Sequence, residues 1–218
     1  MSINSPISYH LRELEIARNQ EPPYYVMPRI SENDKAILDI GCGIGQTFVA
    51  SSIENGKLLV GLDIDLDSLL YGKGQFSYIN YVNGTAECLP FKSDSFNFVF
   101  SRLSLPYTDI PRSLSEIRRV LKEDGNVWFV LHSFSRTLKE LKKSVVKFGI
   151  KGTILRIYVI ANGIFLHLFG KQFAFPLHNR YESFQTESGI TKALKKAGFR
   201  NIAIHRVTHF IVTAQKMA

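Results

Sequence analysis

The stretch AILDIGCGIGQ, residues 36–46, places three glycines directly behind a short apolar segment. Gly41, Gly43 and Gly45 occupy alternate positions, and Asp39 stands two residues before the first of them. Glycine weakens a strand and loses more backbone entropy on folding than any other residue, so a series of glycines indicates a tight turn or the close approach of another group. We therefore interpret the apolar segment as a strand that ends in a glycine-rich turn.

Short apolar segments alternate with amphipathic segments along most of the chain. Apolar runs flanked by turn residues are typical of buried strands, and apolar residues spaced by three and four are typical of helices. The predicted strands are residues 36–40, 57–63, 78–82, 96–101, 127–131, 202–207 and 210–214. The predicted helices are residues 8–19, 44–53, 110–122 and 186–197, with one more capped by Asp65 or Asp67. This order predicts an α/β fold, a doubly wound, Rossmann-like, seven-stranded and mostly parallel sheet with helices on both faces.

The composition fits one globular domain with an ordinary core, since 45% of the 218 residues are apolar. The two cysteines, Cys42 and Cys88, lie far apart, and the six histidines form no HExxH motif, with one pair, His205 and His209, four residues apart. These patterns argue against a disulfide framework and against a metal site. The first ten residues contain no apolar signal-peptide core, so we expect a cytoplasmic protein.

The charge is unevenly distributed along the chain. Residues 1–132 contain 12 Lys and Arg against 16 Asp and Glu, a net charge of −4, whereas residues 133–218 contain 15 against 3, a net charge of +12. A basic half of this kind is typical of a surface for nucleic acid, anionic lipid or an acidic substrate, and equally of a solvated basic face.

An acid at the end of the second predicted strand points to a nucleoside ligand. Asp63 lies 22 positions after Gly41, where a carboxylate accepts hydrogen bonds from ribose hydroxyls in nucleotide-binding α/β folds. The dinucleotide fingerprint needs a third glycine where this chain has Gln46. Asp39, before the turn, would repel a pyrophosphate but attract an ammonium group. The pattern therefore favours a cationic nucleoside cofactor over NAD or FAD.

Several stretches, in order, carry a family resemblance: LDIGCGIG, VGLDID, NGTAECLPFKSDSFNFVFS, SLSEIRRVLKEDGNVWFV and KALKKAGFRNIAI. Together they resemble the class I S-adenosylmethionine-dependent methyltransferases, especially the small-molecule branch similar to the ubiquinone and menaquinone biosynthesis enzymes. The resemblance covers residues of about 35–132 and 186–215. It implies that S-adenosylmethionine is the cofactor.

The resemblance also implies roles for individual residues. Asp39 would orient the turn and bind the methionine ammonium, directly or through water. The three glycines would admit the methionine and ribose portions, and Asp63 would bind the ribose. Thr85, Ala86 and Glu87 would contact the adenine. The remaining members of the predicted cofactor-binding set are Cys42, Ile64 and Arg102. Apolar walls for the adenine could come from Leu62, Ile64 and Leu89, which could equally be core residues.

Methyl transfer from a sulfonium is a direct displacement, so the protein needs a base only when the acceptor must lose a proton. The catalytic candidates are Tyr107 and His132, which follow the fourth and fifth predicted strands; His178 and Tyr181 are further candidates. The Asn/Asp-Pro-Pro-Tyr signature of enzymes that methylate base amino groups does not occur after the fourth strand, and this argues against a nucleic-acid substrate.

Residues 134–185 interrupt the α/β pattern. We interpret them as a helical lid inserted into the methyltransferase domain of residues 35–133 and 186–218, with residues 1–34 as an N-terminal helix and cap. The apolar run Ile157–Leu166 contains ten residues, fewer than the 20 or so that span a bilayer. The favoured lid buries Ile157, Ile160, Phe165 and Leu166 against the core and an apolar substrate; peripheral contact with a membrane through residues 139–170 is the alternative.

Three functions remain open from the sequence. The first is methyl transfer to a small, apolar or lipid-like acceptor, which the apolar insertion favours. The second is methylation of RNA or protein, which the basic half favours. The third is a non-catalytic protein that keeps the cofactor site. The sequence does not indicate the methylated atom or the oligomeric state.

Overall fold

The structure is a computed structural model that describes residues 6–22, 25–51, 53, 56–147, 149–176, 179–206 and 209–217. Of residues 144–147 and 149 it describes the backbone only.

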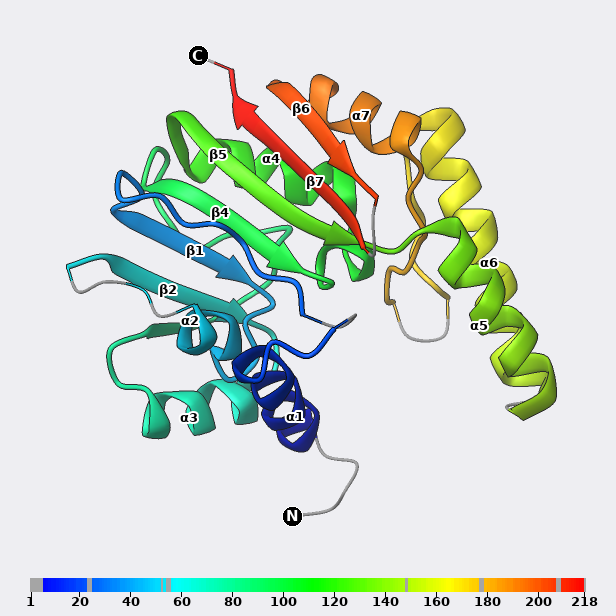
Figure 1. Ribbon diagram of the computed structural model, residues 1–218. Coiled ribbons are helices and arrows are strands. Elements are labelled where there is room, and N and C mark those ends of the chain that lie inside the picture. The colour runs from blue at the N-terminus through cyan, green and yellow to red at the C-terminus, as the bar shows by residue number, and fades with distance from the viewer. Residues whose placement is uncertain are drawn as a thin grey trace.

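A single seven-stranded sheet forms the centre of the molecule (Figure 1). Its spatial order is β3-β2-β1-β4-β5-β7-β6. Strands β1 to β5 run parallel to one another, and β7 runs antiparallel between β5 and β6. The strands are β1 Ala36–Ile40, β2 Leu58–Asp63, β3 Asn80–Asn83, β4 Phe96–Arg102, β5 Leu121–Leu131, β6 Phe199–His205 and β7 Phe210–Lys216. The predicted doubly wound, mostly parallel sheet is confirmed.

The helices differ from prediction mainly in their bounds. They are α1 Pro6–Arg18, α2 Gln46–Ala50, α3 Leu66–Gln75, the 3-10 turn η1 Leu105–Tyr107, α4 Ile110–Val120, α5 Phe134–Lys147, α6 Gly149–Phe169 and α7 Glu187–Lys196. The predicted helix 44–53 was too long, because Gly45 is left-handed, with φ of 84°, and forms the N-cap of α2. The helix predicted to end at residue 122 stops at Val120, where β5 begins directly. Thr186 caps α7 as its sequence indicates, since its hydroxyl accepts the Gly189 N–H at 3.0 Å.

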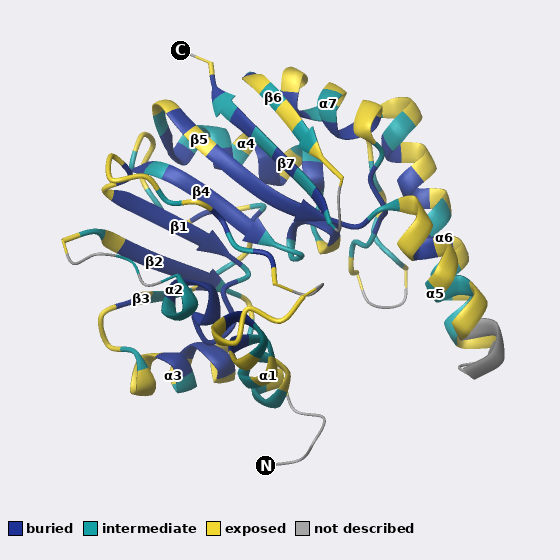
Figure 2. Cartoon of the chain, in the orientation of Figure 1, coloured by how far each residue is buried: buried dark blue, intermediate teal, exposed yellow. Residues whose placement is uncertain are grey.

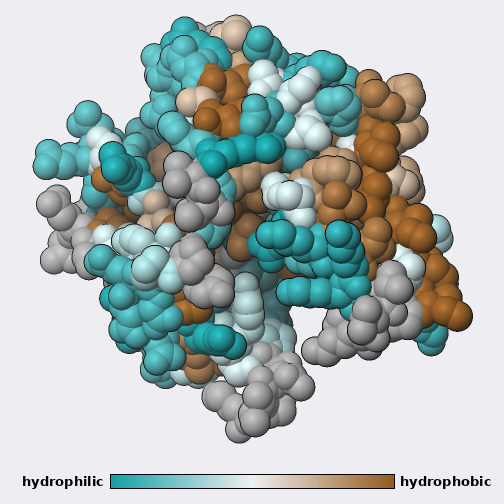
Figure 3. Space-filling view, turned by 45° about the vertical axis from the view of Figure 1, so that its right-hand side comes forward, coloured by the Kyte–Doolittle hydropathy of each residue, from teal (hydrophilic) through white to brown (hydrophobic). Residues whose placement is uncertain are grey.

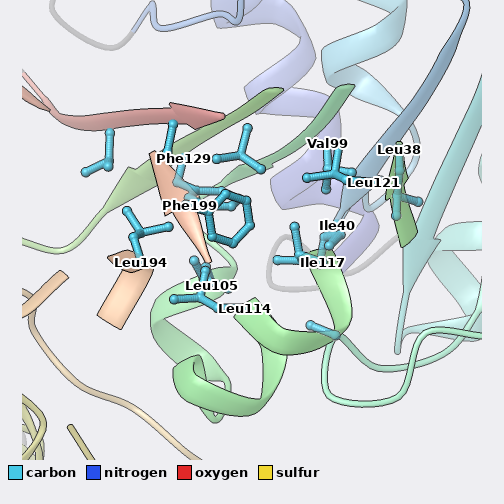
Figure 4. Packing of buried hydrophobic residues seen from close by; sticks show 14 of the residues in the cluster. Leu38, Ile40, Val99, Leu105, Leu114, Ile117, Leu121, Phe129, Leu194 and Phe199 are labelled. Carbon is cyan, nitrogen blue, oxygen red and sulfur yellow. The ribbon is translucent and has the colours of Figure 1, made fainter. Parts of the chain in front are cut away.

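Two apolar clusters cover the two faces of the sheet. Figure 2 shows the buried strands, and Figure 4 shows part of the first cluster. Successive side chains of a strand point to opposite faces, so Leu38 belongs to one cluster and its neighbour Ile37 to the other. The first cluster includes Leu114 of α4 and Leu194 of α7, and the second includes Phe48 of α2. Because helices and apolar side chains cover both faces of the sheet, a ligand site is expected at the edge where the parallel strands end.

The insertion forms two packed helices, α5 and α6, beside the carboxyl ends of the parallel strands (Figure 1). Its α6 is longer than the sequence indicated: Ile150–Phe169 is a 20-residue stretch of mean hydropathy 1.5, long and apolar enough to cross a membrane by these criteria. The predicted lid face was also wrong in part. Leu166 is buried, but Ile157 is 56% exposed and Phe165 37%, because the opposite side of α6 packs on the domain.

Candidate active site

The glycine-rich turn lies at the carboxyl end of β1 and leads into α2. Gly41, Gly43 and Gly45 all have positive φ, of 77°, 55° and 84°. This left-handed backbone explains the alternate glycines, because a side chain is strained there. A Cβ atom at Gly41 would also collide with the Ser104 side chain, and one at Gly43 would collide with the His10 ring.

Asp63, the last residue of β2, holds this turn from the neighbouring strand. Its Oδ2 accepts the Gly43 N–H at 2.8 Å and its Oδ1 accepts the Asp65 N–H at 2.9 Å. Each carboxylate oxygen keeps a further lone pair. The carboxylate therefore fixes the glycine turn and retains the capacity to accept hydroxyl groups.

Asp39 is the most unusual polar group of the site. It is 1% exposed, and neither carboxylate oxygen has a hydrogen-bond partner in the described part of the chain. Burial raises the pKa of this carboxyl well above its ordinary value; Arg102 opposes the rise and Asp63 adds to it. A buried acceptor without a donor costs free energy, and a cationic ligand would supply the missing donor.

Arg102, at the end of β4, reaches the N-terminal helix. Its guanidinium forms an ion pair with Glu13 of α1 at 3.0 Å, and its side chain is 7% exposed. Next to Glu13 on the same helix, His10 places its Nδ1 3.2 Å from Nε2 of Gln46. Burial lowers the pKa of His10, while Asp63 and Asp65 oppose the shift. Helix α1 is thus fastened over the glycine turn.

Sequence reasoning missed His10 and Glu13. Both contacts join α1 to residues more than 30 positions away, and no local motif marks them. A mid-helix histidine and glutamate on a moderately amphipathic segment carry no signal of a site. The helical pattern alone could have placed both residues within one turn of each other.

The loop after β3 contains the predicted adenine contacts. Thr85 is exposed and Ala86 is buried. One carboxylate oxygen of Glu87 accepts the backbone N–H of Asp109, the N-cap of α4, at 2.9 Å. Glu87 therefore fastens the start of α4.

The residues predicted to form apolar walls for the adenine differ in their exposure. Leu62 and Leu89 lie in the core, 2% and 3% exposed, so the core interpretation holds for both. Ile64 is 73% exposed, directly after Asp63. The buried thiol of Cys42 lies against Gly61 of β2, where any side chain would collide with it. Cys42 thus packs the turn against the sheet.

Tyr107 and His132 meet at the ends of β4 and β5. Their ring centroids are 5.2 Å apart at 89°, an edge-to-face contact. Burial lowers the pKa of His132 to about 4, with Arg136 and Arg156 adding to the effect. Desolvation raises the pKa of the half-exposed Tyr107 to about 12, with Glu182 adding. Both side chains are therefore uncharged near neutral pH.

The end of the insertion returns to this pair. The Ser183 N–H donates to the Pro106 carbonyl at 3.1 Å, and the Gln185 N–H donates to the His132 carbonyl at 2.8 Å. Arg156 of α6 pairs with Glu140 at 3.0 Å and Glu182 at 2.8 Å. Tyr181 is partly buried beside this segment, and His178 lies outside the described residues.

The comparison with known proteins agrees with this arrangement. Residues 38–129 match the family model described as a methyltransferase domain. This match and the relatives described below support a class I S-adenosylmethionine-dependent methyltransferase. S-adenosylmethionine is therefore the cofactor of this methyltransferase, and the unpartnered carboxylate of Asp39 fits its ammonium group.

Curated relatives extend the match beyond the domain model. The methyltransferase is 27% identical to the demethylmenaquinone methyltransferase of Chlorobaculum tepidum over 78% of this chain and 67% of that protein. It is 30% identical to the malonyl-[acyl-carrier protein] O-methyltransferase of Pectobacterium atrosepticum over 43% of this chain and 37% of that protein.

Solved structures share the fold. One from Thermotoga maritima, titled as an S-adenosylmethionine-dependent methyltransferase and possible histamine N-methyltransferase, superposes with a TM-score of 0.58 at 19% identity, covering 95% of this chain and 89% of that one. The YcgJ protein of Bacillus subtilis gives 0.57 at 16% identity, covering 96% and 100%. At these identities the likeness concerns the fold of the methyltransferase.

The free methyltransferase is expected to gain stability from Asp39→Asn. The raised pKa means that the folded state loses stability as the pH rises above about 4, the ordinary value for Asp. An amide does not ionise and so avoids this loss, which should raise the free energy of unfolding at neutral pH by about 1–3 kcal/mol. Denaturant melts across the acid range measure this gain, which should shrink as the pH falls toward 4.

Calorimetry completes the Asp39 experiment. The Asn variant should bind S-adenosylmethionine more weakly than the wild type, because the amide carries no charge for an ammonium. Asp34→Asn provides the control, since Asp34 is also buried but its carboxylate accepts the Ser31 N–H at 2.7 Å. A variant that is less stable than the wild type at neutral pH would contradict the assignment of an uncompensated charge to Asp39.

Proposed function

We propose that this methyltransferase transfers a methyl group from S-adenosylmethionine to a small, apolar or lipid-like acceptor. The observation that carries the proposal is the pair of uncharged rings, Tyr107 and His132, at the end of the sheet where the aromatic insertion returns. An uncharged, partly buried surface of this kind favours an apolar acceptor over a polyanion.

Aromatic residues of the insertion support the same acceptor class. Tyr158 packs against Phe173 and Phe175, with ring centroids 5.6 Å and 4.9 Å apart. Phe165 packs against Phe173 at 5.8 Å. The relatives named for demethylmenaquinone and malonyl-acyl-carrier-protein substrates add support, because both names describe acceptors with apolar or acyl parts.

The roles in cofactor binding follow from the geometry of the turn. Asp39 would receive the ammonium, the glycine turn would lie against the methionine and ribose, and Asp63 would accept the ribose hydroxyls. Thr85 and Ala86 would border the adenine, with Ile64 as an exposed apolar wall. When bound, S-adenosylmethionine supplies an electrophilic methyl group on a sulfonium.

The acceptor side needs positioning more than acid–base chemistry. Tyr107 and His132 would orient the acceptor, because a direct displacement requires alignment of nucleophile, methyl and sulfur. Where the acceptor is a hydroxyl, the neutral His132 ring can accept its proton at a ring nitrogen.

The first experiment is calorimetric titration with S-adenosylmethionine, S-adenosylhomocysteine and NAD, followed by turnover assays. The expected result is binding of the first two ligands and methylation of demethylated quinones or of acyl chains that carry a free carboxylate. RNA, histones and histamine serve as comparison acceptors. Binding without turnover on any acceptor would contradict the proposed activity, and faster turnover on RNA or protein would replace the proposed acceptor class.

The pH dependence of the reaction tests the role of His132. A base with a pKa of about 4 is unprotonated throughout the neutral range, so it can accept a proton at any pH above about 5. We expect kcat/KM to show no ionisation of this group between about pH 6 and pH 9. A change in kcat/KM near pH 6.5 that disappears in His132→Gln would contradict a neutral His132 in this pH range.

A further inference from the structure

The outer side of α6 presents a row of exposed aliphatic residues. We call this row the α6 stripe. Its members and their exposed fractions are Ile150 (80%), Ile154 (51%), Ile157 (56%), Ile164 (46%) and Leu168 (61%). Their spacing of four, three, seven and four residues places them on one side of the helix. The stripe runs from Ile150 to Leu168, a rise of about 27 Å at 1.5 Å per residue. Figure 3 shows a continuous hydrophobic band along this edge of the molecule.

The opposite side of α6 fixes the helix to the domain. Tyr158, Val159 and Leu166 are buried there. The buried amide of Asn162 donates to the Glu182 carbonyl at 3.0 Å and accepts the Phe173 N–H at 3.0 Å. The stripe therefore faces away from the domain as a consequence of firm packing on the other side. A monomeric protein rarely exposes so long an apolar surface without a partner.

Exposed lysines lie on α5, on α6 and directly after α6. Residues 134–180 contain nine Lys and Arg and one Glu, a net charge of +8. The two arginines Arg136 and Arg156 share Glu140 in ion pairs. Five exposed lysines have no ion pair within the described residues: Lys139, Lys142, Lys143, Lys151 and Lys171. An apolar helix face accompanied by unpaired lysines is typical of attachment to an anionic membrane surface.

We propose that α5 and α6 form a docking face for an anionic lipid surface. The α6 stripe enters the boundary between headgroups and acyl chains, and the lysines contact the lipid phosphates. The proposal extends the proposed function by bringing the active site to the surface from which a lipid-like acceptor would come, but the docking itself does not depend on turnover.

Two other occupants of this face fit the structure less well. A membrane-spanning α6 would carry the Asn162 amide and the Arg156–Glu182 ion pair into the bilayer and would separate them from the domain. A second copy of the chain, packed stripe to stripe, would bring two sets of unpaired lysines together without any acid to neutralise them. Of these three occupants, anionic lipid alone offers both an apolar region for the stripe and negative charge for the lysines.

Sedimentation of the full chain with vesicles tests the proposal. The vesicles contain phosphatidylcholine alone or phosphatidylcholine with phosphatidylglycerol. We expect binding to the anionic vesicles, weakened by salt, and little binding to the neutral ones. The variant Ile154→Ser/Ile157→Ser should bind roughly tenfold more weakly or worse, and Lys142→Glu/Lys143→Glu should lose the preference for anionic lipid.

Matched substitutions on α3 serve as controls. Leu70→Ser replaces a leucine that is 59% exposed, and Lys73→Glu reverses an exposed lysine; neither should change vesicle binding. Calorimetry with S-adenosylmethionine shows that each variant is folded and separates failure of docking from failure of the proposed activity.

Three results would overturn the proposal. The first is equal sedimentation of the wild type and the stripe variant. The second is a dimer in analytical ultracentrifugation that the stripe variant dissociates, without vesicle binding, which would assign the face to a second copy. The third is retention in vesicles after an alkaline carbonate wash, which would assign α6 to a membrane span.

Discussion

Replacement of Gly43 by valine is expected to abolish binding of S-adenosylmethionine. The residue has a φ of 55°, where a β-branched side chain is strained, and the space beyond its Cα is already occupied by the His10 ring. Overpacking and backbone strain each cost about 1–3 kcal/mol. Because the valine would either displace the turn or block the ligand, we expect a loss of affinity of about 100-fold or more, measured by calorimetry.

A matched control separates the site from a general effect on the fold. Gly74 lies in α3, and a Cβ atom there would meet no atom within 4 Å. Gly74→Val should therefore bind the cofactor normally. A second arm combines Gly43→Ala with His10→Ala, which removes the ring above the turn. If this double variant binds as well as the wild type, the loss arises from the ring of His10, and direct approach of the ligand to Gly43 is wrong.

Removal of the Asp63 carboxylate should produce the second-largest loss. Asp63→Ala deletes the acceptor predicted for the ribose hydroxyls and also the acceptor of the Gly43 N–H. Hydrogen bonds to a charged group contribute about 1.5–3 kcal/mol, so the affinity for S-adenosylmethionine should fall roughly 10-fold to 150-fold. Calorimetric titration measures the change directly.

Two further variants sharpen the Asp63 experiment. Asp67→Ala removes an exposed carboxylate from the first turn of α3 and should leave the affinity unchanged. Asp63→Asn keeps an acceptor oxygen for the turn but lacks the charge, so its affinity should lie between those of the wild type and the alanine variant. Unchanged affinity in Asp63→Ala would remove Asp63 from the cofactor site.

The fold was predictable because local pattern and tertiary structure agree along most of the sheet. Residues 36–40 are an apolar run with no polar residue but Asp39, and all five are buried in β1. The bounds of β5 were harder to predict. Its first half contains Lys122, Glu123 and Asp124, which indicate a helix end and a turn, yet these residues extend the strand past a register shift opposite β4.

The candidate site was predictable to different degrees in its two halves. The glycine turn and Asp63 are linked by a direct hydrogen bond, as a motif of strand, turn and acid requires. Their contacts with the cofactor stay predictions. The edge-to-face pair of Tyr107 and His132 carries no local signal, because the two residues follow different strands and meet only when β4 and β5 pair.

The surface side of α6 could not be read from the sequence. Both sides of the helix are apolar, so periodicity does not tell which one packs on the domain. Asn162 favours this orientation, because besides the Tyr158 hydroxyl of its own helix its amide bonds to the backbone of Phe173 and Glu182 in the segment after α6. Ile157 and Phe165, predicted to be buried, consequently lie on the exposed side.

The place of β7 in the sheet has a consequence for the order in which the molecule folds. The last strand of the chain lies between β5 and β6 and pairs with both. Until β7 is in place, one edge of β5 has no hydrogen-bonded neighbour. The two strands are separated in sequence by the whole insertion, so their pairing closes a long loop. Such long-range pairing is slow and leaves an unpaired strand edge that promotes aggregation. Because β5 leads directly to His132, the proposed acceptor side would be completed only when β7 has joined the sheet.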